Sequence, residues 1–155
     1  MKKVLLLVLG LALIAGCSKK DVVTDKKQSS AIGYGATGSD AGQAGELKSI
    51  HFDFDKANLS TEARNILKAN AGWLKKNPSI LIQIEGHCDS RGTIEYNIAL
   101  GEKRALSVKK YLSDLGVKKD RMSTISYGKE RPLVAEENEA AWAQNRRANF
   151  VIASK

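Results

Sequence analysis

Apolar and polar residues follow two alternating periods along residues 47–155, one typical of strands and one typical of helices. A strand is predicted where a short apolar run alternates with polar residues and is bounded by turn residues. Four segments fit this description: 50–55, 80–87, 122–127 and 148–153. Between them, apolar residues recur every three or four positions, which predicts helices over 60–77, 94–115 and 136–145.

The predicted helix over 94–115 has the clearest pattern of the three. Its apolar and small residues recur in steps of four and three at Ile94, Ile98, Gly101, Ala105, Val108, Leu112 and Leu115. Gly116 follows where a left-handed helix cap is expected, and Ser60 with Glu62 marks the start of the first helix. The order βαβα followed by βαβ predicts an α/β sandwich with helices on one side of a mixed sheet.

The first 16 residues have the layout of an export signal. Two lysines precede an apolar run over 4–15, which is about half the length needed to span a bilayer. The sequence Ile-Ala-Gly-Cys at 14–17 resembles a bacterial lipobox, so we predict that Cys17 is lipidated and holds the chain on a membrane. Ser18, rather than aspartate, favours the outer membrane as the destination. The alternative is an ordinary secretory signal with an incidental cysteine.

Composition then divides the rest of the chain. Residues 17–46 are rich in Lys, Ser, Gly, Ala, Thr and Asp without a sustained period, which predicts a lipidated N-terminus and flexible linker. Residues 47–155 have the size of one domain with one core.

Charge and cysteine content narrow the possible partners. The formal charge of +8 falls to +6 when residues 1–16, with their two lysines, are removed. Nucleic acid is a poor partner for an exported protein, whereas a basic surplus favours an anionic polymer or membrane surface. Once Cys17 is lipidated, Cys88 is the one remaining thiol and has no cysteine to pair with.

The candidate chemistry lies in the stretch 86–105, where a charged loop ends an apolar strand and leads into a helix. Asn97, Gly101 and Arg104 are four and three residues apart, so they share one helical face. A half-shielded Arg104 presents a planar fork to a carboxylate, and Asp89 in the loop can accept from an ammonium. This arrangement suits a small zwitterion.

Four motifs together resemble one family. Phe-Asp-Phe-Asp at 52–55, the stretch 86–105, Tyr-Gly at 127–128 and Asn-Arg-Arg at 145–147 are similar to the peptidoglycan-binding, OmpA-like domain family. The resemblance covers residues 47–155. Cys88 departs from the family pattern, in which a small residue such as alanine or threonine is more usual.

This resemblance implies a function and a site. It implies an outer-membrane lipoprotein, facing the periplasm, that tethers the membrane to the cell wall and works with the Tol machinery during envelope constriction. The ligand is the diaminopimelate stem peptide of peptidoglycan, and a periplasmic propeller protein, TolB, is the implied protein partner. No cofactor, metal or catalytic residue is expected. The implied ligand-binding residues are Asp53, Phe54, Asp89, Asn97, Arg104 and Arg147.

Each candidate also has a purely structural interpretation. Asp89 could form only a surface pair with Arg91, and Arg104 could be a snorkelling helix residue. Asp53 and Phe54 could be ordinary residues at the end of a strand, Arg147 could brace the last strand, and His87 is more typical of a hydrogen-bonded strand end than of a ligand. If Asp89 and Arg104 do bind the wall, we expect folding to survive replacement of either by alanine.

Two other classes of function compete with wall binding. His87, Cys88 and Asp89 in series look like a catalytic or metal cluster, but neighbours on an extended chain point to opposite faces and cannot converge on one atom. Hydrolysis of peptidoglycan is therefore a distant alternative. The third class is a wall-anchoring module of another envelope machine, although a motor protein would need a membrane span.

Overall fold

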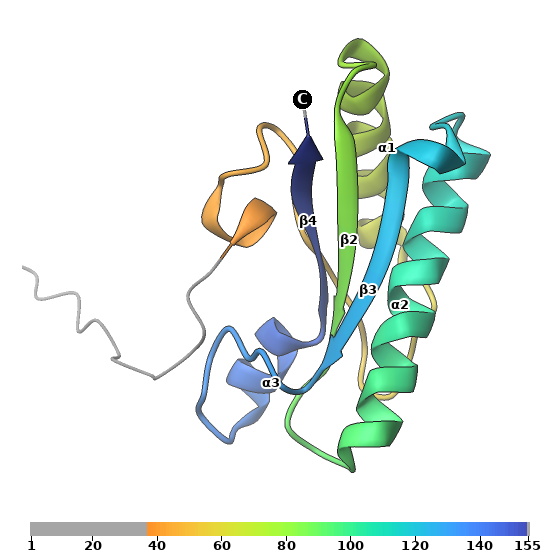
Figure 1. Cartoon of the computed structure of the whole chain (residues 1–155). Helices are drawn as coiled ribbons and strands as arrows, with labels where there is room; N and C mark the ends of the chain where they lie inside the picture. The colour runs from red at the N-terminus through yellow and green to blue at the C-terminus, as the bar shows by residue number, and fades with distance from the viewer. Residues whose placement is uncertain (1–36, 155) are drawn as a thin grey trace, which may run out of the picture.

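The computed structural model describes residues 37–154 and contains the predicted alternation of strands and helices (Figure 1). In chain order the elements are η1 (Gly38–Ala41), β1 (Ile50–His51), α1 (Thr61–Lys76), β2 (Leu81–His87), α2 (Ile94–Asp114), η2 (Lys119–Arg121), β3 (Met122–Gly128), α3 (Glu139–Asn145) and β4 (Arg147–Ser154), where η marks a short 3-10 helix.

The four strands form one mixed sheet in the order β1-β4-β2-β3. β2 and β3 are parallel, while β4 is antiparallel to both β2 and β1. The connection between the parallel strands is α2, as parallel pairing requires a crossover. The predicted mixed α/β sheet is confirmed.

Side-chain caps explain where the helices begin. The hydroxyl oxygens of Ser60 and Thr93 accept hydrogen bonds from Ala63 N and Tyr96 N, which satisfies backbone donors at the starts of α1 and α2. Asn138 caps α3 in the same way, so this helix begins three residues later than the predicted Glu136. After α2, Gly116 adopts the predicted left-handed conformation, with φ 92°.

Both long helices pack on the same face of the sheet, as predicted (Figure 1). Leu67 and Leu74 of α1 and Val108 and Leu112 of α2 are at most 1% exposed. They meet the side chains that point inward from the central strands, namely Ile82, Ile84, Ala148 and Phe150. This contiguous apolar layer fixes α2 against β2.

The opposite face of the sheet carries a buried polar network. Asn149 on β4 donates to Glu85 on β2 over 2.7 Å, and Glu85 contacts His87 Nε2 over 3.5 Å. Burial would raise the pKa of Glu85, but these hydrogen bonds outweigh it and lower the pKa. Burial lowers the pKa of His87, whose Nδ1 has no hydrogen-bond partner among the described residues. His87 was expected to be a hydrogen-bonded residue at a strand end, and it forms a hydrogen bond through one of its two ring nitrogens.

The segment 37–46 covers part of this polar face, and the prediction of a flexible linker is wrong for these ten residues. The carboxylate of Asp40 in η1 accepts from Arg147 Nε over 2.6 Å, and the Asp40 side chain is almost fully buried. Ser39 donates to the side-chain oxygen of Asn149. Ala44 is completely buried. The signal segment 1–16, Cys17 and the rest of the predicted linker lie outside the described residues.

The first strand is shorter than the predicted 50–55. Regular pairing with β4 stops after His51, and Phe52 N makes one further bond, to the Arg146 carbonyl. The chain then turns, because Lys56 N donates to the Asp53 carbonyl and Asp55 takes a positive φ of 57°. Aspartate tolerates this left-handed conformation better than most residues. The Asp53 and Asp55 side chains therefore point in different directions.

Candidate functional site

A cavity of about 180 Å³ opens where β2 ends and α2 begins. The turn after β1, the loop 88–93 and the first turns of α2 form its walls. The lining residues are Phe54, Asp55, Cys88, Asp89, Arg91, Gly92, Tyr96, Asn97, Leu100 and Arg104. Of the six predicted ligand-binding residues, four line it: Phe54, Asp89, Asn97 and Arg104.

Two glycines allow α2 to pack closely on β2 beside this cavity. A Cβ atom on Gly86 would lie 1.8 Å from the carbonyl oxygen of Gly101, and one on Gly101 would lie 2.3 Å from Ser126 Oγ. No side chain fits at either position without moving backbone or a bonded hydroxyl. Gly101 was predicted to lie on the inner face of the helix, but its contact with the backbone of β2 has no sequence signal beyond the glycine itself.

Asp89 is 4% exposed and accepts four N–H hydrogen bonds. Three come from Arg91 (its backbone N, Nε and Nη2), and the fourth comes from Arg146 Nη1 over 3.3 Å. Burial would raise the pKa of the Asp89 carboxyl, but the hydrogen bonds from Arg91 and Arg146 outweigh burial and lower the pKa. The pairing of Asp89 with Arg91 is therefore present, with the Asp89 side chain buried and the Arg91 side chain 31% exposed.

Arg91 joins three parts of the site. Its guanidinium carbon lies 4.0 Å from the centre of the Phe54 ring and 4.1 Å from the Trp142 ring, so the cation is held between two aromatic faces. Nη2 donates to Asp89 over 2.6 Å. Sequence reasoning did not include Arg91 among the site residues, although its place two residues after Asp89 was a usable signal.

Arg104 is fully buried, more deeply than the predicted half-shielded position, and it is not a snorkelling side chain. Its Nε, Nη1 and Nη2 donate to the carbonyl oxygens of Lys56, His87 and Asp53 at 2.9, 2.8 and 3.1 Å. Burial lowers its pKa. A guanidinium has five N–H groups, so one on each terminal nitrogen remains beyond these three bonds.

Asn97 lines the cavity but is occupied by the loop before α2. Its amide nitrogen donates to the carbonyl oxygens of Arg91 and Thr93 at 2.7 and 2.9 Å. Because Asn97 is 2% exposed, its main contribution is to fix the loop that carries Asp89.

Two predicted site residues have side chains outside the cavity. The Asp53 carboxylate is 72% exposed and pairs with Lys56, so only the Asp53 carbonyl reaches the site, through Arg104. Arg147 points to the polar face of the sheet and pairs with Asp40, which agrees with the bracing role. The residues that reach the site are their neighbours, Asp55 and Arg146.

Asp55 and Arg146 were missed for a common reason. Asp55 lines the cavity and accepts a hydrogen bond from the Tyr96 hydroxyl, and Arg146 donates to Asp89. Each motif offered two like residues, Asp53 or Asp55 and Arg146 or Arg147. Side chains alternate along extended backbone, so only one of Arg146 and Arg147 could face the site, and the sequence did not decide which.

The Cys88 thiol has the properties of a packing residue. It is 2% exposed, Sγ donates to the Asn97 carbonyl over 3.3 Å, and burial raises its pKa to about 11. His87 turns away to Glu85, as expected for a neighbour in a strand. Within residues 37–154 no three His, Cys, Asp or Glu side chains gather as metal ligands, and no helix is long and apolar enough to cross a bilayer.

Comparison with known proteins decides the family. Residues 51–146 match the OmpA family. The chain belongs to the OmpA family. Two relatives are named peptidoglycan-associated lipoprotein: that of Brucella melitensis is 39% identical over 142 residues, 90% of this chain and 84% of the relative, and that of Pasteurella multocida is 43% identical over 148 residues, 94% of both chains.

Solved structures agree with this membership. The crystal structure of the peptidoglycan-associated lipoprotein from Burkholderia pseudomallei is 47% identical, covers 66% of this chain and 87% of its own, and superposes with a TM-score of 0.65. The C-terminal domain of Helicobacter pylori MotB, at 19% identity, covers 70% of this chain and 86% of its own with a TM-score of 0.66, and shares the fold alone. Membership of the OmpA family favours a binding module over an enzyme.

Proposed function

We propose that the domain binds peptidoglycan non-covalently, holding the diaminopimelate side chain of the stem peptide in the cavity. The observation that carries this proposal is the placement of both charge signs in one small cavity: the carboxylates of Asp55 and Asp89 lie with the guanidiniums of Arg91 and Arg104. A group with an ammonium and a carboxylate on one carbon complements such a cavity. The relatives' name, peptidoglycan-associated lipoprotein, supports peptidoglycan as the ligand.

The carboxylate of the ligand is assigned to Arg104. Three backbone carbonyls hold the guanidinium in place, so little side-chain entropy is lost on binding. The remaining N–H on each terminal nitrogen can donate to a carboxylate, and a charge-assisted bond of this kind gains strength in a shielded site.

The ammonium of the ligand is assigned first to Asp55. Asp89 already accepts four N–H bonds, whereas the Asp55 side chain accepts a bond from the Tyr96 hydroxyl. Asp89 remains part of the proposed site, because it fixes Arg91 and adds negative charge to the wall of the cavity. Phe54 lines the cavity and stacks on the Arg91 guanidinium.

The turn after β1 offers a matched test of this assignment. Asp55→Asn removes a charge from the cavity, whereas Asp53→Asn removes the same charge from an exposed carboxylate outside it. We expect Asp55→Asn to weaken binding to purified wall sacculi by roughly ten- to a hundredfold, as loss of a close charge pair typically does. Asp53→Asn should bind within about twofold of the unchanged protein. Equal binding by both variants would remove Asp55 from the site.

We further propose that the chain is an outer-membrane lipoprotein that tethers this membrane to the wall, facing the periplasm within the Tol system. The lipobox at 14–17 and the relatives named as lipoproteins support the anchor. The role in envelope constriction and the TolB-like propeller partner follow from family resemblance. A peptidoglycan hydrolase is disfavoured by the buried, high-pKa thiol of Cys88.

The anchor has a direct test. Lipidation requires the Cys17 thiol, so Cys17→Ser is expected to leave the protein outside the membrane fraction after detergent-free fractionation with a wash at about 1 M salt, which removes contacts made by charge alone. The same variant should keep its affinity for isolated sacculi, because the cavity lies in residues 54–104. A Cys17→Ser protein that still fractionates with outer membranes would contradict the lipoprotein assignment.

A further inference from the structure

The positive excess of the described domain lies at one end. Residues 37–154 contain 18 Lys and Arg and 15 Asp and Glu, a net charge of +3. The segments 75–76 and 109–121, which we call the basic end, contain seven basic and two acidic residues, a net charge of +5. The rest of the described domain therefore carries −2, and all of its positive excess lies at the basic end.

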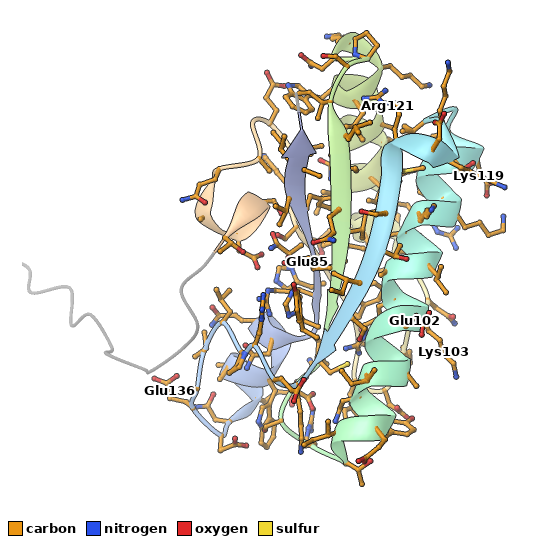
Figure 2. The ribbon with its side chains drawn as sticks, viewed as in Figure 1. Glu85, Glu102, Lys103, Lys119, Arg121 and Glu136 are labelled. Atoms are coloured by element: carbon orange, nitrogen blue, oxygen red, sulfur yellow. The ribbon has the colours of Figure 1, made fainter. Side chains whose placement is uncertain are left out.

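The fold brings these two segments together. The guanidinium of Arg121 donates to the carbonyl oxygens of Leu74, Asn77 and Ile80 over 2.7–3.0 Å, which ties η2 to the end of α1. Gly116 lies next to the Lys75 side chain. Figure 2 shows Lys119 and Arg121 at the end of the molecule where α2 finishes. Along α2, ten residues separate Arg104 at the cavity from Asp114 at the end of the helix, which is about 15 Å.

Four lysines at the basic end are available to a partner. Lys75, Lys76, Lys118 and Lys119 are exposed, and none forms an ion pair with another described residue. A position in the last turn of a helix stabilises Lys75 and Lys76 through the helix dipole, but Lys118 lies outside any helix and Lys119 lies in η2, which has only three residues. Helix stability therefore does not account for the whole cluster.

We propose that the basic end binds the anionic phospholipid headgroups of the membrane to which the chain is anchored. The proposal rests on the lipid anchor of the proposed function. The one arginine at this end is consumed by backbone carbonyls, so the available groups are compact ammonium charges on flexible stems, which suit a diffuse anionic surface better than a single shaped anion. Contact through this end would turn the cavity away from the membrane and toward the wall.

The test compares two triple variants with equal net charge. One carries Lys76→Gln, Lys118→Gln and Lys119→Gln at the basic end. The other carries Lys48→Gln, Lys68→Gln and Lys103→Gln at exposed positions elsewhere, of which Lys103 is seen on α2 in Figure 2. Both are made in the mature chain from residue 17 with Cys17→Ser. Cosedimentation is measured with vesicles of phosphatidylcholine alone or of phosphatidylcholine with about one third phosphatidylglycerol, an anionic lipid.

We expect the unchanged chain to prefer the anionic vesicles, and the basic-end variant to bind them at least about fivefold more weakly, with the other triple variant within about twofold. Equal losses in the two variants would show that net charge alone acts, and binding to pure phosphatidylcholine at the same level would exclude headgroup charge. Either result overturns the proposal. Sacculus binding by the basic-end variant is measured in parallel and is expected to be unchanged, because none of the three lysines lines the cavity. Loss of sacculus binding by the unchanged chain would contradict the proposed function and not this proposal.

Discussion

Replacing Gly86 with alanine is expected to lower the free energy of unfolding by about 3 kcal/mol or more, the upper part of the range for overpacked sites. The added Cβ would lie 1.8 Å from the Gly101 carbonyl oxygen and 2.5 Å from its carbonyl carbon. Both atoms belong to the backbone of α2, so the clash is relieved only if the helix moves away from β2. Urea denaturation of the full mature chain measures the change.

Gly72→Ala is the matched control for this prediction. Gly72 lies in α1, is exposed, and has no atom within 4 Å of an added Cβ. Alanine is a better helix former than glycine, so this variant should be unchanged or more stable by up to about 1 kcal/mol. If Gly86→Ala is as stable as Gly72→Ala, the close packing of α2 on β2 is wrong. Because α2 positions Arg104, the Gly86 variant should also lose sacculus binding.

Replacing Arg104 with alanine is expected to cost about 3–5 kcal/mol of folding stability and to abolish specific wall binding. The change leaves the carbonyl oxygens of Asp53, Lys56 and His87 without their donor, and a buried unsatisfied group typically costs about 1–3 kcal/mol. The expectation from sequence that folding survives this change does not fit a fully buried guanidinium. Arg104 thus has two roles, in the fold and in the proposed site.

A second substitution separates these roles. Arg104→Lys keeps the positive charge but has one nitrogen in place of three, so it is expected to retain part of the stability and to lose the paired N–H groups that a carboxylate needs. The control is Lys103→Ala on the exposed side of α2, which should change stability by no more than about 0.5 kcal/mol. If urea denaturation shows that Arg104→Ala changes the free energy of unfolding by no more than about 0.5 kcal/mol, the structural role of Arg104 is wrong.

The sequence predicted the parts of the fold that depend on local periodicity. The steps of four and three along α2, the Ser60 cap and the left-handed Gly116 are all present, because each depends on residues close in the chain. Phe54, Asp89, Asn97 and Arg104 could also be selected from the sequence as site residues, because they belong to two compact motifs, and all four line the cavity.

Two of the missed parts depend on contacts distant in the chain, and a third depends on the conformation of one turn. The ion pair of Asp40 with Arg147 joins residues 107 positions apart and folds a segment whose composition is typical of a linker. The choice of Asp55 over Asp53 follows from a turn with one positive φ, and the burial of Arg104 follows from three backbone carbonyls supplied by two other segments. No local pattern contains this information.

Competition between two stem peptides during sacculus binding tests the central proposal most directly. One peptide contains diaminopimelate, and the other has lysine in its place with the overall charge matched elsewhere. A shaped pocket predicts that binding to sacculi persists at about 1 M salt, where the screening length is about 3 Å. It also predicts that only the diaminopimelate peptide competes, because lysine lacks the carboxylate assigned to Arg104. Loss of binding at high salt together with equal competition by both peptides would contradict a shaped site and show a general attraction between a basic protein and an anionic wall.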